Sequence, residues 1–436
     1  MKKARVLILM LTLCLLITAF CPAALAVGAE PDITARHAIV IELNTGAVLY
    51  EKDADETALP ASTTKIMTAL ITCEAIEKGT VSLDDLVTAK AEDVYLSDPD
   101  ASNAGISAGE KMTLRDLCYC MMLPSANEAA NVVASHVAGS VNGFVAMMND
   151  KAGALGCKST HFANTNGLPA GDHYTTAREL AMITQEALKY DLFRELCGAS
   201  EYTVPATNVS GERELSNSNA IINPDSFYGS SYYLEGAYGV KTGHLSDAGY
   251  CLVSAVKRGD LDLLCVVLGS DGSMENYYFR NFTDTATLVD YCEKNFHFKT
   301  VIRAAEVVGS IAVDKGKQET LSVSPAEDIG LLLSDDVDTA SLQRIISYDY
   351  DAVPAPVKKG AAVGRVEVKD SEGNTLCTCE LVANEDVEAS FFAYAAAKIK
   401  AFLLKLLRVA AIIALILIVV AFAAVFLKHK RKGKKK

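Results

Sequence analysis

The chain has 436 residues, of which 50% are hydrophobic and 22% are charged, and its formal net charge is −13. This length exceeds one typical domain, and this balance of apolar and charged residues suits a substantial core. The sequence therefore predicts two folded domains with terminal segments, and its acidic balance argues against nucleic acid as a tightly held partner.

The N-terminus has the pattern of a secretory signal peptide. Three basic residues precede the apolar stretch Val6–Phe20, and the small residues that follow end at Ala26. Such a segment is removed on export, so residues 1–26 are predicted to be absent from the mature protein. Cys21 offers lipoprotein processing as an alternative, but the residues before it are bulkier than that processing favours.

Residues 30–297 are predicted to form one domain of the α/β class, of the α+β type. Two hairpins are predicted, with turns at Asn44-Thr45-Gly46 and at Arg258-Gly259-Asp260, and helical patterns lie between them. One helix opens at Pro60 and runs to about Lys78 with apolar residues on nearly every side, which is typical of a buried helix. Strands at both ends with helices between them predict an antiparallel sheet flanked by helices and completed by non-local pairing.

Residues 299–388 change to short alternating strands with turns and prolines, and they predict a small all-β domain. The clearest hairpin pairs residues 363–369 with 375–382 around Glu372-Gly373-Asn374. No set of chemically reactive residues is recognisable in this domain, so we interpret it as a spacer.

The C-terminus predicts a membrane anchor. Residues 391–408 mix apolar and basic residues, as in an amphipathic segment lying along a membrane surface. Residues 409–427 are uncharged and lack Gly and Pro, and as a helix they span about 28 Å, close to the thickness of the bilayer hydrocarbon. A buried core helix is the alternative, but it would not normally end in a tail with seven basic residues such as 428–436.

These two ends together predict a single-pass protein of the cell membrane. The basic tail marks the cytoplasmic side, and the signal peptide places the body outside the cytoplasm. Residues 1–26 hold three basic residues and the tail holds seven, with no acidic residue in either, so the remainder of the chain carries a net charge of −23.

Ser62 and Lys65 lie three residues apart at the start of the buried helix, so both side chains project from one face. A lysine amine beside a serine hydroxyl activates the serine as a nucleophile without histidine, provided that the amine is desolvated. Taken alone, this S-x-x-K pattern also fits a capping serine beside a surface lysine. The apolar surroundings favour the catalytic interpretation, because buried polar groups need a reason.

Two further motifs follow along the chain. Ser125-Ala126-Asn127 lies in a predicted loop between two helices, where Ser and Asn are also common helix caps. Lys241-Thr242-Gly243 ends a predicted apolar strand, where the cation and the hydroxyl can hold a carboxylate. Each motif is weak alone, but S-x-x-K, then S-x-N 63 residues later, then K-T-G a further 116 residues on, form the signature set of penicillin-recognising enzymes.

With these motifs the chain resembles the low-molecular-weight penicillin-binding proteins of the D-alanyl-D-alanine carboxypeptidase family. The resemblance includes Thr45–Tyr50, Pro60–Ala69, Gly167–Pro169, His173–Ala177 and Val240–His244. It implies a penicillin-binding transpeptidase/β-lactamase-like fold and an enzyme that removes the terminal D-alanine from peptidoglycan stem pentapeptides. It also implies inhibition by β-lactams and a reaction without a metal or an organic cofactor.

The resemblance implies catalytic roles for three side chains. Ser62 is the nucleophile that forms the acyl-enzyme, Lys65 is the general base, and Ser125 helps to pass a proton to the departing D-alanine. Glu128 is a departure from the family pattern, because relatives often carry Asp there. The predicted spanning anchor is another, because many relatives use an amphipathic helix on the membrane surface.

The resemblance also implies a substrate-binding set. Asn127 orients the substrate backbone, and Lys241 and Thr242 hold the terminal carboxylate. The backbone amides of Ser62 and His244 form the oxyanion hole, and Arg280 is a candidate for a further arginine that assists carboxylate binding.

Two alternatives remain open from the sequence. A β-lactamase on the same fold would need a dedicated deacylating glutamate, and no convincing Glu-x-x-x-Asn element lies between the second and third motifs. A catalytically silent cell-wall-binding scaffold would have no need of all the motif residues together. Neither of the closely spaced cysteine pairs, Cys118/Cys120 and Cys377/Cys379, has the spacing of a zinc site, so no metal is expected.

Overall fold

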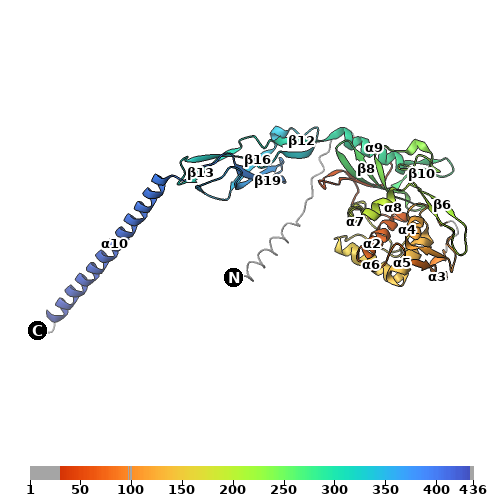
Figure 1. Ribbon diagram of the computed structural model, residues 1–436, viewed down its shortest axis with the longest axis horizontal. Helices are drawn as coiled ribbons and strands as arrows, with labels where there is room; N and C mark the ends of the chain where they lie inside the picture. The colour runs from red at the N-terminus through yellow and green to blue at the C-terminus, as the bar shows by residue number, and fades with distance from the viewer. Residues whose placement is uncertain (1–29, 97, 99–100, 433–436) are drawn as a thin grey trace. The chain divides into compact units, whose positions relative to one another are not determined.

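The computed structural model describes residues 30–96, 98 and 101–432 (Figure 1). The predicted signal peptide lies outside these residues, as do residues 433–436 of the predicted cytoplasmic tail. The described chain forms two compact units. The first reaches to Phe298 and also includes Leu332–Asp336, and the second comprises Lys299–Leu331 and the residues from Val337 onward.

The first unit is built on a five-stranded sheet in the order β2-β1-β9-β8-β7, in which neighbouring strands run antiparallel. The hairpin of β1 (His37–Glu42) and β2 (Val48–Lys52) comes from the N-terminal end of the unit. The strands β7 (Ala237–Leu245), β8 (Gly249–Arg258) and β9 (Leu261–Ser270) come from its C-terminal end. Pairing of β1 with β9 joins the two groups, which confirms the predicted sheet with non-local pairing.

Two apolar cores lie on opposite faces of this sheet, because side chains alternate along each strand. Along β9, Leu264, Val266 and Leu268 belong to the first core, and Leu263, Cys265 and Val267 belong to the second. The first core includes residues from α2 (Lys65–Glu77), α4 (Leu114–Met122), α5 (Asn127–Ala138), α6 (Val141–Ala154), α7 (Ala177–Ala187) and α8 (Asp191–Gly198). The second includes α9 (Arg280–Asn295) and the loop around Ile221. Helices therefore flank the sheet, as predicted.

Helix α2 lies at the centre of the first core, and every residue from Lys65 to Cys73 is buried. Apolar residues on nearly all sides predicted this environment. The start of the helix differs from the prediction, because Ala61–Thr64 form a 3-10 turn, η2, and the α-helix begins at Lys65. Ala61 has a φ of +48°, a left-handed conformation that does not continue into a helix.

Several short elements complete the first unit. Two small hairpins are β3 (Leu86–Thr88) with β4 (Lys111–Thr113), and β5 (Glu201–Val204) with β6 (Arg213–Ser216). A third joins β10 (Gly272–Ser273) to β11 (Tyr278–Phe279) directly after β9. The remaining elements are α3 (Ala91–Val94) and the 3-10 turn η3 (Ser230–Tyr232).

The second unit contains a six-stranded sheet in the order β16-β18-β19-β14-β13-β17, which confirms the predicted small all-β domain. The predicted hairpin corresponds to β18 (Ala362–Lys369) and β19 (Thr375–Ala383). The other strands of this sheet are β13 (Gly309–Asp314), β14 (Thr320–Pro325), β16 (Gln343–Tyr348) and β17 (Val353–Pro354). Strands β12 (Phe296–Ile302) and β15 (Ile329–Ser334) form a separate pair, and η4 covers Thr339–Ser341.

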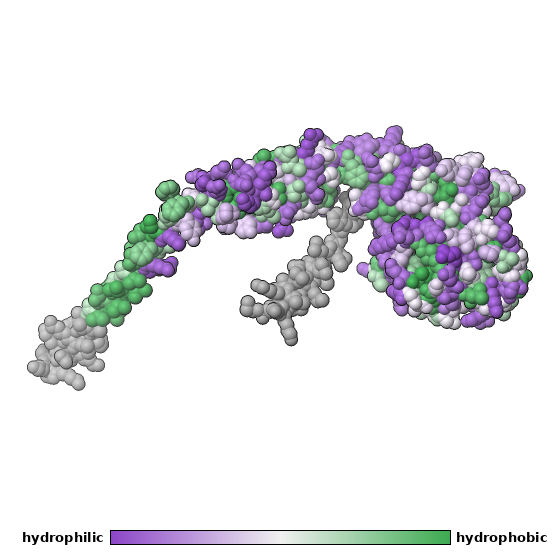
Figure 2. All heavy atoms as spheres, in the orientation of Figure 1, coloured by the Kyte–Doolittle hydropathy of each residue, from purple (hydrophilic) through white to green (hydrophobic). Residues whose placement is uncertain are grey.

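The C-terminal residues form one unbroken helix, α10 (Phe391–Lys432). Within Phe391–Ala421 it is long and apolar enough to cross a membrane, and none of its most apolar window is buried (Figure 2). The segment 391–408, predicted to lie along a membrane surface, is continuous with the predicted spanning helix 409–427. Residues 391–408 lack Gly and Pro and are rich in Ala, Leu and Lys, so they continue the helix.

Candidate active site

Ser62 and Lys65 come together where η2 passes into α2. The Lys65 side chain is fully buried, and its Nζ lies 3.0 Å from Ser62 Oγ. The same Nζ donates to Asn127 Oδ1 and to the main-chain oxygen of Asn166, each at 2.8 Å. These two acceptors satisfy both N–H groups of a neutral amine, which leaves its lone pair for the Ser62 hydroxyl.

The environment favours the neutral form of this amine. Burial is the largest cause that lowers the pKa of Lys65 well below its ordinary value, because a buried ammonium loses its hydration. The nearby Lys241 lowers it further, whereas the Glu128 carboxylate acts in the opposite direction. Burial also lowers the pKa of Lys241, to about 7. Lys65 is therefore suited to accept a proton from a neighbouring hydroxyl.

The Ser125-Ala126-Asn127 motif lies between α4 and α5. The N-cap of α5 is Ala126, and no side chain caps the helix there, so the capping interpretation of the motif is wrong. Ser125 has a φ of +66°, and its buried hydroxyl has no hydrogen-bond partner within the described part of the chain. A buried hydroxyl of this kind is costly unless a ligand satisfies it, so Ser125 is placed for contact with a bound molecule.

Asn127 links the lysine to a neighbouring loop. Its Oδ1 accepts the hydrogen bond from Lys65, and its Nδ2 donates to the main-chain oxygen of Ser102 at 2.9 Å. The backbone amide of Asn127 donates to the same Ser102 oxygen at 2.9 Å. Both ends of the Asn127 amide are thus engaged by the protein, and the residue fixes the position of Lys65.

The third motif lies within β7 rather than at its end, because the strand pairs with β8 as far as Leu245. Lys241 is buried, and its Nζ donates to the main-chain oxygen of Thr242 at 3.2 Å. Thr242 Oγ1 lies 2.7 Å from Ser218 Oγ, which orients that hydroxyl. His244 is exposed and stacks on Tyr250 with ring centroids 4.1 Å apart.

Gly243 allows β7 to lie directly against the nucleophile turn. A Cβ at this position would lie 3.1 Å from the Ser62 amide nitrogen and 3.1 Å from the Pro60 carbonyl oxygen. Any side chain there would push the strand away from η2. The glycine therefore brings the main chain that precedes His244 beside the Ser62 amide.

A buried hydrogen-bond chain behind Ser62 was not predicted. His173 Nδ1 accepts from the Ala163 amide at 3.0 Å, and its Nε2 lies 2.8 Å from Thr64 Oγ1. A backbone amide can only donate, so Nδ1 carries no hydrogen, and Nε2 donates to Thr64. The Thr64 hydroxyl donates in turn to the Ala61 carbonyl at 2.8 Å. Burial lowers the pKa of His173 to about 4, so the ring keeps this neutral form near neutral pH.

The same carbonyl is held from a second side by Gly167. A Cβ there would lie 1.9 Å from the Ala61 oxygen, and the φ of Gly167 is +90°, so only glycine fits. Gly167 and His173 both lie in segments that carry the family resemblance. Their local sequence gives no indication that they contact the residue before Ser62, so only the fold reveals this support.

Arg280 has other contacts than those predicted for it. Its Nε donates to Asp284 Oδ1 at 3.1 Å, and a terminal nitrogen donates to the main-chain oxygen of Asp32 at 3.1 Å. The second oxygen of the buried Asp284 accepts from Thr34 and Ala35. These contacts tie the N-terminal segment to α9, and none of them joins Arg280 to the Ser62 cluster. Its role in carboxylate binding stays a prediction.

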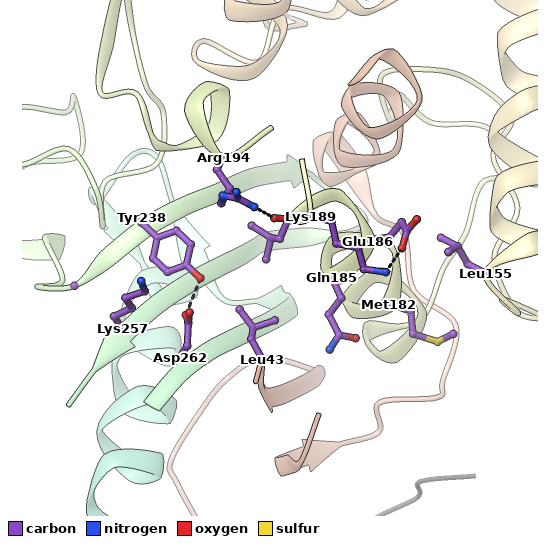
Figure 3. A pocket seen from close by; sticks show the side chains of 12 residues that line it. Leu43, Leu155, Met182, Gln185, Glu186, Lys189, Arg194, Tyr238, Lys257 and Asp262 are labelled. Carbon is purple, nitrogen blue, oxygen red and sulfur yellow. Dashed lines mark hydrogen bonds and ion pairs between the residues drawn. The ribbon is translucent and has the colours of Figure 1, made fainter. Parts of the chain in front are cut away.

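A separate hollow of about 930 Å³ lies at the other end of β7 (Figure 3). Its lining includes Tyr238, whose hydroxyl donates to Asp262 at 2.7 Å, and Lys257, which lies over the Tyr238 ring. Lys189 pairs there with Glu186 at 2.6 Å. None of the motif residues lines this hollow, and its polar groups contact one another, so we assign it no part in the site. Across the described ranges, no group of three or more His, Cys, Asp or Glu side chains has the arrangement of a metal site, and the ten cysteines are free.

Known families match both units. A family model described as D-alanyl-D-alanine carboxypeptidase matches residues 25–272, more than half of the chain. A second model, described as Penicillin-binding protein 5, C-terminal domain, matches residues 296–389. The first match includes all three motifs.

Individual relatives extend over most of the chain. D-alanyl-D-alanine carboxypeptidase DacF of Bacillus subtilis is 31% identical over 358 residues, which cover 82% of this chain and 87% of the relative. D-alanyl-D-alanine carboxypeptidase DacA of Escherichia coli (strain K12) is 28% identical over 371 residues, covering 83% and 86%. The crystal structure of a peptidoglycan synthesis regulatory factor from Streptococcus pneumoniae aligns with 82% of this chain and 100% of its own, with 26% identity and a TM-score of 0.64.

The hydrogen-bond chain predicts the behaviour of two Thr64 variants. Thr64→Val removes the hydroxyl that holds the Ala61 carbonyl, and we expect it to slow acylation by a fluorescent penicillin about tenfold, as for one lost buried hydrogen bond. Thr64→Ser keeps the hydroxyl and is expected to react within about twofold of the wild type. The measurement is the second-order labelling rate constant, with the urea midpoint of each variant recorded beside it. Equal labelling rates for the two variants would show that the chain does not position Ser62.

Proposed function

This chain belongs to the D-alanyl-D-alanine carboxypeptidase family of low-molecular-weight penicillin-binding proteins, and we propose from that premise that Ser62 removes the terminal D-alanine from peptidoglycan stem pentapeptides through an acyl-enzyme. The observation that carries the proposal is the buried contact of 3.0 Å between Lys65 Nζ and Ser62 Oγ. Because both amine hydrogens have other acceptors, the lone pair of a neutral Lys65 is available for the serine proton.

Acylation begins when Ser62 Oγ attacks the carbonyl carbon between the two D-alanines, while its proton moves to Lys65 Nζ. Negative charge develops on the carbonyl oxygen, and the backbone amides of Ser62 and His244 donate to it. The close packing at Gly243 supports this pairing of amides. The C–N bond then breaks, and Ser125 relays the proton held by Lys65 to the leaving amine, which returns Lys65 to its neutral form. The unpartnered buried hydroxyl of Ser125 supports that role. Water hydrolyses the ester and restores Ser62, and β-lactams inhibit the enzyme at the acyl stage.

The terminal carboxylate of the substrate is held by the Lys241 ammonium and the Thr242 hydroxyl. Burial of Lys241 supports this assignment, because a buried cation gains from an anionic partner. The Ser218 hydroxyl orients Thr242 for the same contact. The second hydrogen of Asn127 Nδ2 orients the substrate backbone, while the amide oxygen of Asn127 holds Lys65.

Substitution of the nucleophile tests the proposal. In the detergent-solubilised full-length chain, Ser62→Ala is expected to abolish covalent labelling by fluorescent penicillin and to lower D-alanine release from a pentapeptide at least about a thousandfold. Ser231→Ala removes an exposed hydroxyl and should leave both signals unchanged. Labelling that decays rapidly with turnover of the penicillin would indicate a β-lactamase. A folded wild type that shows neither labelling nor release would indicate a scaffold.

The two buried lysines predict a bell-shaped pH profile for kcat/KM. Lys65 must be neutral to accept a proton, so the rate rises as the pH increases through its lowered pKa. Lys241 must be charged to hold a carboxylate, so the rate falls as the pH increases through about 7. Lys241→Arg keeps a cation at high pH and is expected to remove the alkaline fall. An alkaline limb that is unchanged in Lys241→Arg would show that another group causes it.

The C-terminal apolar helix associates the protein with a membrane, and we propose that it crosses the membrane once, with the catalytic unit outside and the basic tail in the cytoplasm. The exposed apolar stretch in α10 and the seven basic residues after Leu427 support this topology.

An epitope added after Lys436 tests the topology. It should resist protease added to intact cells and should become accessible once the cells are permeabilised. An epitope inserted at the exposed turn Glu372-Gly373 serves as the control and should be cut in intact cells. Cleavage of the C-terminal epitope in intact cells would contradict a cytoplasmic tail.

A further inference from the structure

An aromatic patch on the catalytic unit takes no part in the reaction proposed above. We define it as Phe227 and Tyr277, whose exposed fractions are 70% and 64%, while Met274 and Tyr278, at 49% and 46%, are exposed on the same hairpin as Tyr277. Phe227 lies in the loop before η3, and the other three lie on the β10–β11 hairpin. The rings of Phe227 and Tyr277 are 6.0 Å apart. Gathered aromatic side chains left in solvent mark binding surfaces, because covering them removes apolar area from water.

A continuous series of ring contacts joins the patch to the third motif. His244 stacks on Tyr250 at 4.1 Å, and Tyr250 contacts Phe279 at 5.4 Å. Phe279 contacts Tyr228 at 4.7 Å, and Tyr228 contacts Phe227 at 5.6 Å. The exposed ring of Phe227 is therefore four ring contacts from the residue whose amide is proposed for the oxyanion hole.

Sheet topology explains why these groups meet. His244 pairs with Tyr250 near the start of β8, and Tyr250 pairs with Ser270 at the end of β9. The β10–β11 hairpin follows at once, so it begins at the end of the sheet where the third motif lies. A Cβ at Gly272 would lie 2.4 Å from the Tyr250 ring, so the hairpin packs directly on the ring that supports His244. The patch thus has a fixed base rather than resting on a free loop.

The reach of the substrate matches this placement. An extended peptide advances about 3.4 Å per residue, so the stem residues between the scissile bond and the sugar place the sugar outside the Ser62 cluster, as the patch is. Tyrosine and phenylalanine offer flat apolar faces, and the tyrosine hydroxyls can still hydrogen-bond at the edge of the contact. Sugar rings present apolar C–H faces bordered by hydroxyl groups, which such a surface complements.

The charge around the patch favours an uncharged partner. Residues 223–236 and 270–279 contain Asp225, Glu235, Asp271 and Glu275, and the charge of the adjoining Arg280 is paired with Asp284. An anionic membrane surface would be repelled by these carboxylates, whereas a neutral sugar would not.

We propose that the aromatic patch binds the glycan strand of peptidoglycan from which the stem peptide extends into the active site. This inference rests on the proposed function, because it assumes that the Ser62 cluster holds the stem peptide. On this proposal, the patch contributes to the binding of substrates that carry sugars and does not contribute to the binding of free peptides.

The test compares two substrates with the full-length chain in detergent. The double variant Phe227→Ala/Tyr277→Ala is expected to lower kcat/KM on polymeric peptidoglycan about tenfold, as for two lost aromatic contacts. Release of D-alanine from the free pentapeptide should stay within about twofold of the wild type. Tyr350→Ala removes an exposed ring of the second unit and should change neither rate. Both truncated rings are exposed, so the variant opens no cavity in the core.

Three outcomes would overturn the inference. Equal loss on both substrates would mean that the rings only support His244. No loss on either substrate would mean that the patch binds nothing in this reaction. Conversion of a wild-type dimer to a monomer, seen by light scattering with both rates unchanged, would mean that the patch joins two copies. Failure of the proposed function is distinguishable, because the free pentapeptide would then be inert in the wild type as well.

Discussion

The structure of the catalytic unit depends on the burial of one amine. Lys65 lies at the start of the helix at the centre of the first core, and its Nζ has no water-exposed surface. An isolated charge there would be very costly, so the amine is held near its neutral form, with acceptors from α5 and the loop at Asn166 and with the Ser62 hydroxyl of η2 beside its lone pair. Those three segments meet at this one amine. The contacts that make the lysine tolerable in the core are therefore the same contacts that make it a base.

Backbone conformation near the nucleophile follows from that packing. Ala61 and Ser125 both have positive φ angles, which cost a residue other than glycine roughly 1–3 kcal/mol each. Such conformations persist only where the surroundings hold them. Around Ala61 the Thr64 hydroxyl, ordered by His173, and the close approach of Gly167 supply that restraint. The nucleophile is thus positioned by a rigid turn, so little reorganisation is left for the reaction itself.

The two faces of the five-stranded sheet pack against different elements. On one face it packs against the helices that carry Lys65 and the S-x-N motif, and on the other it packs against α9 and the rings of Tyr250 and Phe279. β7 is an edge strand of the sheet. Its Gly243 lies against η2, and His244, near the end of the strand, stacks on Tyr250. One strand therefore connects the site that cleaves the stem peptide with the surface proposed to hold the sugar.

The sequence by itself determined the sheet hairpins, the buried helix, the β domain and the three motifs, because each is a local pattern of apolar period, turn residues or fixed spacing. The spacing of Ser62 and Lys65 even placed both on one face of the chain. Only the tertiary structure decided that η2 precedes α2, that Asn166 contributes a carbonyl, and that His173 and Gly167 support Ala61. It also paired Arg280 with Asp284 and ran residues 391–432 as one helix. The contacts of Asn166, His173 and Gly167 join segments far apart in the chain or use main-chain atoms, and main-chain groups are the same in every residue, so no residue type in the sequence indicates them.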